Sequence, residues 1–370
     1  MASHVPFLAV RPNDQFSSDP TSSQDSQLSE AAKRDLLDPI ADMDAPPIQS
    51  PRAARAPAAS RLPAFVRFPM VVIISLALST FFNTLIADFT GYELAAVSRD
   101  VTSESQIATL MAWKLVELGF AWWAGYDWQD LSSLAILSNL PYYFLLTTFY
   151  NIDSSAAAIS LAIETAVIGI PFALLRPLIR AHEPGSSPNQ QVAQDRFVGV
   201  SVGLLGAAIY AVVIYGSLYT WLPVYLVQNF DGLRSLEGAH NASIPMLVLS
   251  FLPLGWATVQ FLFTPVVGSH GNPGITDPAL YPEKLPFDGE AATFSDTIAY
   301  NLGFSDGFSK RAETLFKRTA VLIACSTANT FTRVLLTVEG SEPVGAAGWA
   351  SVWGVAALMT SVVYGFVANE

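Results

Sequence analysis

The sequence predicts an all-α fold: a polytopic membrane helix bundle of about eight transmembrane helices, with both termini cytoplasmic and a disordered N-terminal arm. Three observations predict it. Hydrophobic residues make up 51% of the 370 residues and charged residues only 14%, whereas a soluble domain carries roughly 25% charged residues. Apolar runs long enough to cross the hydrocarbon, which takes about 20 residues, recur from Phe68 onwards. Lys and Arg are spread unevenly over the connections between these runs.

The first 62 residues are the predicted arm. They are rich in Ser, Pro, Ala and Asp and hold few large apolar side chains, so burial would not offset the entropy lost on ordering them. The first long apolar run begins near Phe68, too deep for a signal peptide, and eight acids between Asp14 and Asp44 exclude a mitochondrial presequence. We therefore expect residues 1–62 to be a cytoplasmic arm and residues 63–370 to be the transmembrane domain.

Eight apolar runs are predicted to span the membrane. The third is the weakest, because Asn139 and Pro141 interrupt it. Gly199 and Gly203 in the fifth run predict close helix packing. The aromatic segment 218–228 is too short to span, and we expect it to extend the fifth helix along the interface. The runs cover residues 68–86, 108–124, 131–150, 155–175, 197–217, 244–264, 319–338 and 346–367, with a large cytoplasmic loop over 266–316.

Basic residues set the orientation, because Lys and Arg are held on the cytoplasmic side. Only Arg99 and Arg234 fall on the other side. Asn241 begins the only N-x-[ST] sequon, on that non-cytoplasmic side, and is a glycosylation candidate. We expect the plasma membrane or a membrane of the secretory pathway. The cytoplasmic basic residues are Arg52, Arg55, Arg61, Arg67, Arg176, Arg180, Arg196, Lys284, Lys310, Arg311, Lys317 and Arg318.

Charged residues inside the predicted spans form a candidate site. A charge at the bilayer centre costs roughly 3 kcal/mol or more, so such residues persist where they pair or line a polar cavity. The set holds two bases and two acids at similar predicted depths. It indicates either a path for a small solute or ion, or a buried ion-pair network. With nearby amides, the candidate intramembrane polar cluster is Lys114, Glu117, Glu164, Arg333, Asn83, Asn139 and Asn329.

The sequence shows no signature of catalysis or of a cofactor. Its four histidines lie outside the spans, which argues against a His-ligated haem or di-iron site. It has no P-loop and no G-x-S-x-G motif, and the single Cys325 cannot close an intrachain disulfide. We predict no catalytic residue, no metal and no cofactor. The net charge of −12 and the lack of a basic face argue against a nucleic-acid partner.

Two connections carry weaker signals. Asp127 and Asp130 follow the second span, and we expect Asp130 to cap the helix beginning at Leu131 rather than to bind a cation. Segment 304–318 combines Phe and Leu with Lys and Arg. This pattern predicts either an amphipathic helix against anionic lipid of the cytoplasmic leaflet or a stiff run into the seventh span.

Three function classes remain open at this level. The first moves or senses a small solute or ion through the intramembrane polar cluster. The second is a non-catalytic membrane scaffold or accessory subunit whose buried ion pairs are structural. The third, less favoured, is an intramembrane lipid-modifying enzyme, which needs a nucleophile or metal ligands that the sequence does not offer. The lipid bilayer is the one partner that all three share.

Overall fold

A computed structural model describes residues 63–95, 104–183, 195–268, 293–301 and 310–369. The described residues belong to one compact unit of the chain. The predicted arm lies outside them, so its disorder stays a prediction.

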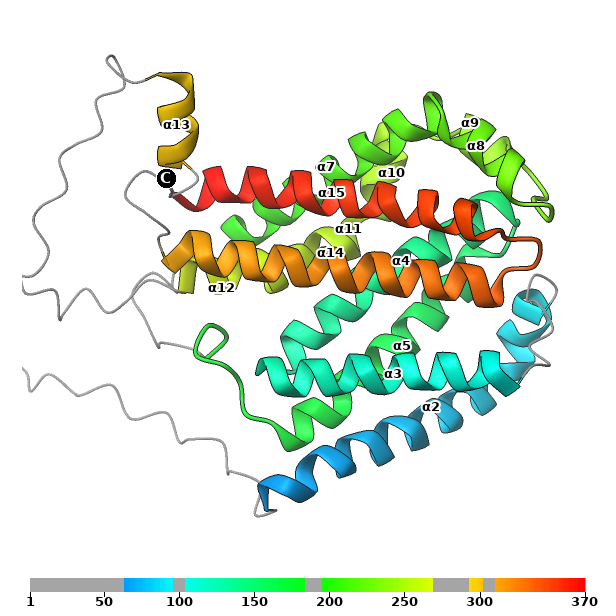
Figure 1. Ribbon diagram of the computed structural model, residues 1–370, viewed down its shortest axis with the longest axis horizontal. Helices are drawn as coiled ribbons and strands as arrows, with labels where there is room; N and C mark the ends of the chain where they lie inside the picture. The colour runs from blue at the N-terminus through cyan, green and yellow to red at the C-terminus, as the bar shows by residue number, and fades with distance from the viewer. Residues whose placement is uncertain (1–62, 96–103, 184–194, 269–292, 302–309, 370) are drawn as a thin grey trace, which may run out of the picture. The chain divides into compact units, whose positions relative to one another are not determined.

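Within the described ranges, every regular element is a helix, and one isolated bridge pairs Phe230 with Ser341. The predicted all-α class is confirmed (Figure 1). The helices are α2 (Ala64–Ala95), α3 (Glu104–Ala124), α4 (Trp128–Phe149), α5 (Ser154–Leu175), α7 (Arg196–Tyr219), α8 (Leu222–Asn229), α9 (Glu237–His240), α10 (Ile244–Ser250), α11 (Leu252–Thr258), the π-helical turn η1 (Val259–Phe263), α12 (Thr264–Gly268), α13 (Phe294–Asn301), α14 (Lys310–Thr337) and α15 (Pro343–Asn369).

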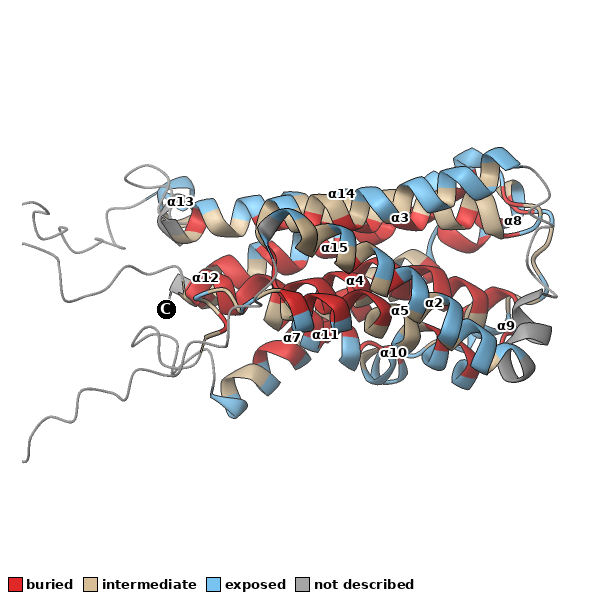
Figure 2. Ribbon diagram, turned by 90° about the horizontal axis from the view of Figure 1, so that it is seen from below, coloured by how far each residue is buried: buried red, intermediate tan, exposed pale blue. Residues whose placement is uncertain are grey.

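Helix α4 occupies the interior of the bundle. It packs against α5, α14 and α11, while α14 and α15 lie side by side. Figure 2 shows α4 buried over most of its length, whereas α2 presents much of its surface outward. A helix enclosed by other helices meets their polar groups instead of lipid. This explains how α4 accommodates Asn139 and several serines.

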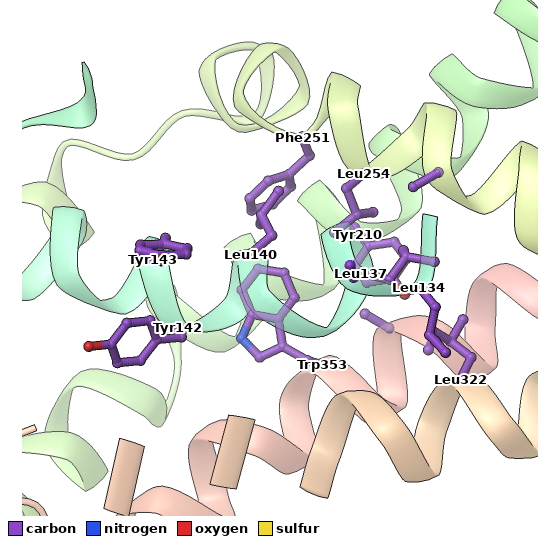
Figure 3. Packing of buried hydrophobic residues seen from close by; sticks show 14 of the residues in the cluster. Leu134, Leu137, Leu140, Tyr142, Tyr143, Tyr210, Phe251, Leu254, Leu322 and Trp353 are labelled. Atoms are coloured by element: carbon purple, nitrogen blue, oxygen red, sulfur yellow. The ribbon is translucent and has the colours of Figure 1, made fainter. Parts of the chain in front are cut away.

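The centre of the core is aromatic (Figure 3). The indole of Trp353 on α15 lies 5.8 Å from the ring of Phe144, 5.6 Å from that of Phe251 and 6.2 Å from that of Tyr210, measured between centroids. Two of these pairs are edge-to-face, the arrangement that ring quadrupoles favour. Trp353 therefore ties α15 to α4, to α7 and to the junction of α10 with α11.

Five helices are long and apolar enough to cross a membrane, namely α2, α5, α7, α14 and α15, and a bent pair formed by α10 with α11–α12 makes a sixth if it is one span. Helices α3 and α4, which contain the predicted spans 108–124 and 131–150, have 21 and 22 residues but are not among those that pass on composition. Membrane-spanning helices are therefore plausible, and the count of eight stays a prediction.

The sixth predicted span, 244–264, is not one continuous helix. Helix α10 ends before Phe251, and the two halves meet at 60°. Pro253 lies in the first turn of α11. Proline has no N–H to donate, and its ring would collide with the carbonyl of residue 249 in a continuous helix. The chain then forms the π-helical turn η1, a feature that is frequent at functional sites.

The fifth predicted span is confirmed as helix, but its predicted extension is not. Helix α7 ends at Tyr219, and α8 starts separately with Pro223 in its first turn. Gly203 of α7 packs directly on Gly255 of α11, where any side chain on Gly255 would overlap the Gly203 carbonyl oxygen. Gly199 has open space instead. Only one glycine of the pair therefore serves helix packing.

Candidate functional site

Arg333 of α14 organises a polar cluster within the bundle. Its Nη1 donates to Glu164 Oε2 on α5 at 2.6 Å and to Asn139 Oδ1 on α4 at 2.7 Å. Asn329, one turn earlier on α14, also donates to Asn139 Oδ1 at 2.8 Å. The indole N–H of Trp113 on α3 donates to Asn329 Oδ1 at 2.9 Å. These five residues, which we call the Arg333 cluster, link four helices.

Tyrosine rings surround the ion pair. The Tyr143 hydroxyl donates to Glu164 Oε1 at 3.1 Å. The Arg333 guanidinium lies 4.3 Å from the ring centroid of Tyr142 and 5.3 Å from that of Tyr143, within the range of a cation–π interaction. The Arg333 and Glu164 side chains keep 17% and 24% of their surface exposed. The charges are thus paired and only partly shielded from their surroundings.

The structure brings together six of the seven predicted cluster residues. Lys114 and Glu117 lie at the margin on α3, with 3.9 Å between Nζ and Oε2, and Glu117 is close enough to Glu164 and Arg333 for their charges to interact. Asn83 does not join them. Its side chain is exposed, and its amide donates to Ser79 of its own helix.

Sequence reasoning missed Trp113 and Tyr143 as members of this site. Both are aromatic residues with one polar atom, and a buried indole N–H or phenol O–H needs a hydrogen-bond partner. That need is the signal that could have placed them in the cluster.

A second buried network surrounds Arg318, about four turns earlier on α14. Its Nη1 donates to Asp130 Oδ1 at 2.5 Å and to the Phe261 carbonyl at 2.8 Å, and its Nη2 donates to Asp130 Oδ2 at 3.0 Å. His182 Nδ1 lies 2.7 Å from Asp127 Oδ2, and its Nε2 lies 3.3 Å from the Gln260 carbonyl. Asp127, Asp130, His182 and Arg318 are the Arg318 network, which holds two carbonyls of η1.

The prediction that Asp130 caps the helix at Leu131 is wrong. Helix α4 begins at Trp128, its N-cap is Asp127, and Asp127 Oδ1 accepts from the Asp130 backbone N–H at 2.9 Å. Asp130 lies in the first turn, where its carboxylate pairs with Arg318. Both aspartates have the spacing of a helix start, so sequence alone did not show which of them the arginine would engage.

Burial and pairing shift the pKa of Asp127 and of His182 in opposite directions. Burial raises the pKa of Asp127, but the hydrogen bond and charge of His182 and the backbone N–H groups of Asp130 and Ile179 outweigh it, so the pKa is lowered. Burial lowers the pKa of His182, but the hydrogen bond from Asp127 and the negative charges of Asp130 and Asp127 raise it overall. Both ring nitrogens of His182 face acceptors, which favours the imidazolium.

The same residues have the composition of a metal site. Asp127, Asp130 and His182 offer donor atoms that all lie within 4.8 Å of one another. Each donor is already engaged, since both oxygens of Asp130 bind Arg318 and His182 Nδ1 faces Asp127. A divalent ion would have to displace a guanidinium and a proton. The arrangement fits two neutral ion pairs better than a metal site.

Beside the network, a pocket of about 640 Å³ opens between α7 and the α11–η1 segment. We call it the Arg196 pocket. Its polar lining comes from the first turn of α7, from α4, from η1 and α12, and from the chain after α5, and its apolar lining from α7, α11 and η1. The polar side chains are Gln129, His182, Asp195, Arg196, Gln260 and Thr264, and the largest apolar ones are Val200, Leu204, Leu252, Trp256 and Val259.

Two other predicted positions are described in part. Asn241 is exposed at the end of α9, directly before α10. Of segment 304–318, residues 304–309 lie outside the described part, and the rest begins α14. Arg318 is buried against Asp130, and Lys317 pairs with Glu313 at 2.6 Å. The basic residues available to anionic lipid are therefore fewer than the sequence suggests.

Residues 195–367 match the model of a protein family described as the Bouquet formation protein 3 C-terminal domain. The match covers somewhat less than half of the chain. It contains Arg196, Arg318 and Arg333, but not their acidic partners on α4 and α5. Comparisons with curated proteins and with solved structures gave no match.

Proposed function

We propose that this chain is an integral membrane scaffold or accessory subunit whose intramembrane charges hold its helices together. The observation that carries the proposal is the saturation of the Arg333 cluster. Asn139 accepts from Arg333 and Asn329 through Oδ1 and donates to the Ala135 carbonyl through Nδ2. A site for a passing solute would keep donors or acceptors free, whereas these are used between helices.

The proposal includes eight spans and cytoplasmic termini. Helices α3 and α4 have the length of a span, about 32 Å at 1.5 Å per residue, and their polar groups find partners inside the bundle. This topology leaves Asn241 on the non-cytoplasmic side. In a host that glycosylates membrane proteins, we expect peptide N-glycosidase F to increase the electrophoretic mobility of the full chain. The Asn241→Gln variant should already show that mobility. A chain insensitive to the enzyme, with its Asn241 accessible to cytoplasmic protease, would contradict the orientation.

The family match suggests the process that the scaffold serves. The matched family is named for bouquet formation, and its name states neither a reaction nor a transported solute. We propose that this chain acts in that process through assembly within a membrane. The plasma membrane and membranes of the secretory pathway remain the expected locations.

One observation favours the transport alternative. The α10–α11 span is broken by a 60° bend and followed by a π-helical turn, and broken helices are used by transporters near the bilayer midplane. The break lies away from the Arg333 cluster, however, and its core side is filled by Phe251 against Trp353. Transport therefore stands second.

A charge swap separates the two functions. We expect Glu164→Arg and Arg333→Glu to lower the thermal stability of the detergent-solubilised full chain, and the double variant to regain part of the loss, because the pair is restored with reversed polarity. Liposomes containing the wild-type chain should show no K⁺ or Cl⁻ flux above protein-free liposomes. A flux that Glu164→Gln abolishes without loss of stability would overturn the scaffold proposal in favour of transport.

A further inference from the structure

The Arg196 pocket divides into a polar end and an apolar wall. Asp195 and Arg196 stand at the first turn of α7, followed along the same lining by Gly199 and Val200 and then by Gly203 and Leu204. From Arg196 to Leu204 the lining extends about 12 Å along the helix axis. Facing residues follow the same division, with Gln260 and Thr264 towards the polar end.

The apolar wall is open to the side of the bundle. Val200, Leu204 and Trp256 are all exposed, although they border a concave space. If α7 spans the membrane, these side chains face the hydrocarbon, and the polar end lies at the level of the lipid headgroups. Arg196 makes no ion pair with any residue in the described ranges, and Asp195 Oδ1 is engaged by the Phe197 backbone N–H.

We propose that the Arg196 pocket binds one membrane phospholipid, with its phosphate against Arg196 and one acyl chain along the wall from Gly199 to Leu204. The guanidinium offers the geometry that binds phosphate oxygens. Gln129 and Gln260 supply neutral polar groups for the glycerol esters. The pocket volume of about 640 Å³ lies within the range that holds a ligand of moderate size.

Gly199 explains why the wall has room for a chain. An added Cβ at Gly199 would meet nothing within 4 Å, whereas the neighbouring Gly203 is closed off by Gly255 and Val259. The glycine thus leaves space on the pocket side of α7 without serving helix contact. Gly216, on the same helix but absent from the pocket lining, also has nothing within 4 Å, so it provides a matched control.

The test uses native mass spectrometry of the delipidated full chain in detergent. Three probes are added separately: dioleoylphosphatidylcholine, dioleoylglycerol and glycerophosphocholine. We expect a one-to-one adduct with the phospholipid, a weaker one with the diacylglycerol, and neither adduct nor competition from the soluble headgroup. Gly199→Leu should lower the phospholipid adduct about tenfold or more, because a single buried side chain is worth that much in affinity. Gly216→Leu should leave it unchanged.

A second variant tests the phosphate contact. Arg196→Gln should reduce phospholipid binding about tenfold, the loss expected for a charge-assisted hydrogen bond, and leave diacylglycerol binding unchanged. Equal adducts in Gly199→Leu and Gly216→Leu would overturn the site. Full competition by glycerophosphocholine would overturn the acyl chain in favour of a soluble phosphoester. Val200→Trp fills the same wall if Gly199→Leu does not fold.

This inference takes from the proposed function only that α7 lies in the membrane. The Glu164–Arg333 swap involves none of the pocket residues, so a failed swap leaves the lipid result interpretable. A failed lipid test likewise leaves the scaffold proposal standing.

Discussion

Arg318 and Arg333 lie on the same helix, and each neutralises a carboxylate of another helix beneath aromatic rings. Arg318 makes a two-pronged contact with Asp130, whose side chain is fully buried, and only 9% of the Arg318 side chain is exposed. Arg333 instead shares one nitrogen between Glu164 and Asn139, and both charged side chains are partly exposed. The first pair is closed in geometry and the second is open to adjustment.

The difference shows that membership of an apolar span is a poor guide to burial. Arg333, within a predicted span, is the more exposed of the two arginines. Arg318, at the end of the same helix, is enclosed because the loop before α4, the chain after α5 and η1 all converge on it. Connections between helices thus form the better-sealed polar site.

The largest expected effect is therefore at Asp130. Asp130→Asn leaves a buried guanidinium without its counter-ion, which costs about 3–5 kcal/mol. Glu164→Gln should cost less, about 1–2 kcal/mol, because its partner is partly exposed and keeps Asn139. Unfolding temperatures from size-exclusion chromatography of the heated, detergent-solubilised chain would measure both. The control is Asp130→Leu with Arg318→Met, which should regain most of the loss. Equal losses at Asp130 and Glu164 would contradict the ranking.

A matched pair of asparagines sharpens the comparison within the predicted cluster. Asn139 is buried and joins Arg333 to Asn329, so Asn139→Ala should cost about 1–3 kcal/mol by leaving both donors unsatisfied. Asn83 is exposed and bonds only within α2, so Asn83→Ala should stay within about 0.5 kcal/mol of wild type. The same thermal assay reports both. A loss at Asn83 as large as that at Asn139 would show that α2 carries a contact absent from the described structure.

Much of this architecture follows from composition, and some of it does not. Apolar length predicts α5, α7, α14 and α15 within a few residues, because a lipid-facing helix must be apolar along its length. The convergence of Glu164, Arg333 and Asn139 was also predictable, since intramembrane charges must find partners.

The Arg318 network was not predictable in the same way. A basic residue at the end of a span has the same pattern whether it faces lipid headgroups or a buried carboxylate. Its partners Asp130 and His182 come from distant connections, and no periodicity in the sequence brings them together. The break at Phe251 was visible in Pro253, but proline is common in membrane helices and marks a bend only where the packing allows one.

The smallest expected effect concerns pH and again separates the two arginines. His182 has a raised pKa and Asp127 a lowered one. The Asp127 contribution is present above its ordinary pKa of roughly 3.9 and lost as pH falls through the lowered value; the His182 contribution is present below roughly 6.5 and lost as pH rises through the raised value. The full chain should thus lose stability as pH increases from about 6 to about 8. His182→Gln should remove this dependence, whereas Arg333→Gln should leave it intact, because no group of the Arg333 cluster touches His182. If His182→Gln keeps the wild-type pH profile, another group titrates in that interval, and the imidazolium is not what holds Asp127 and η1 together.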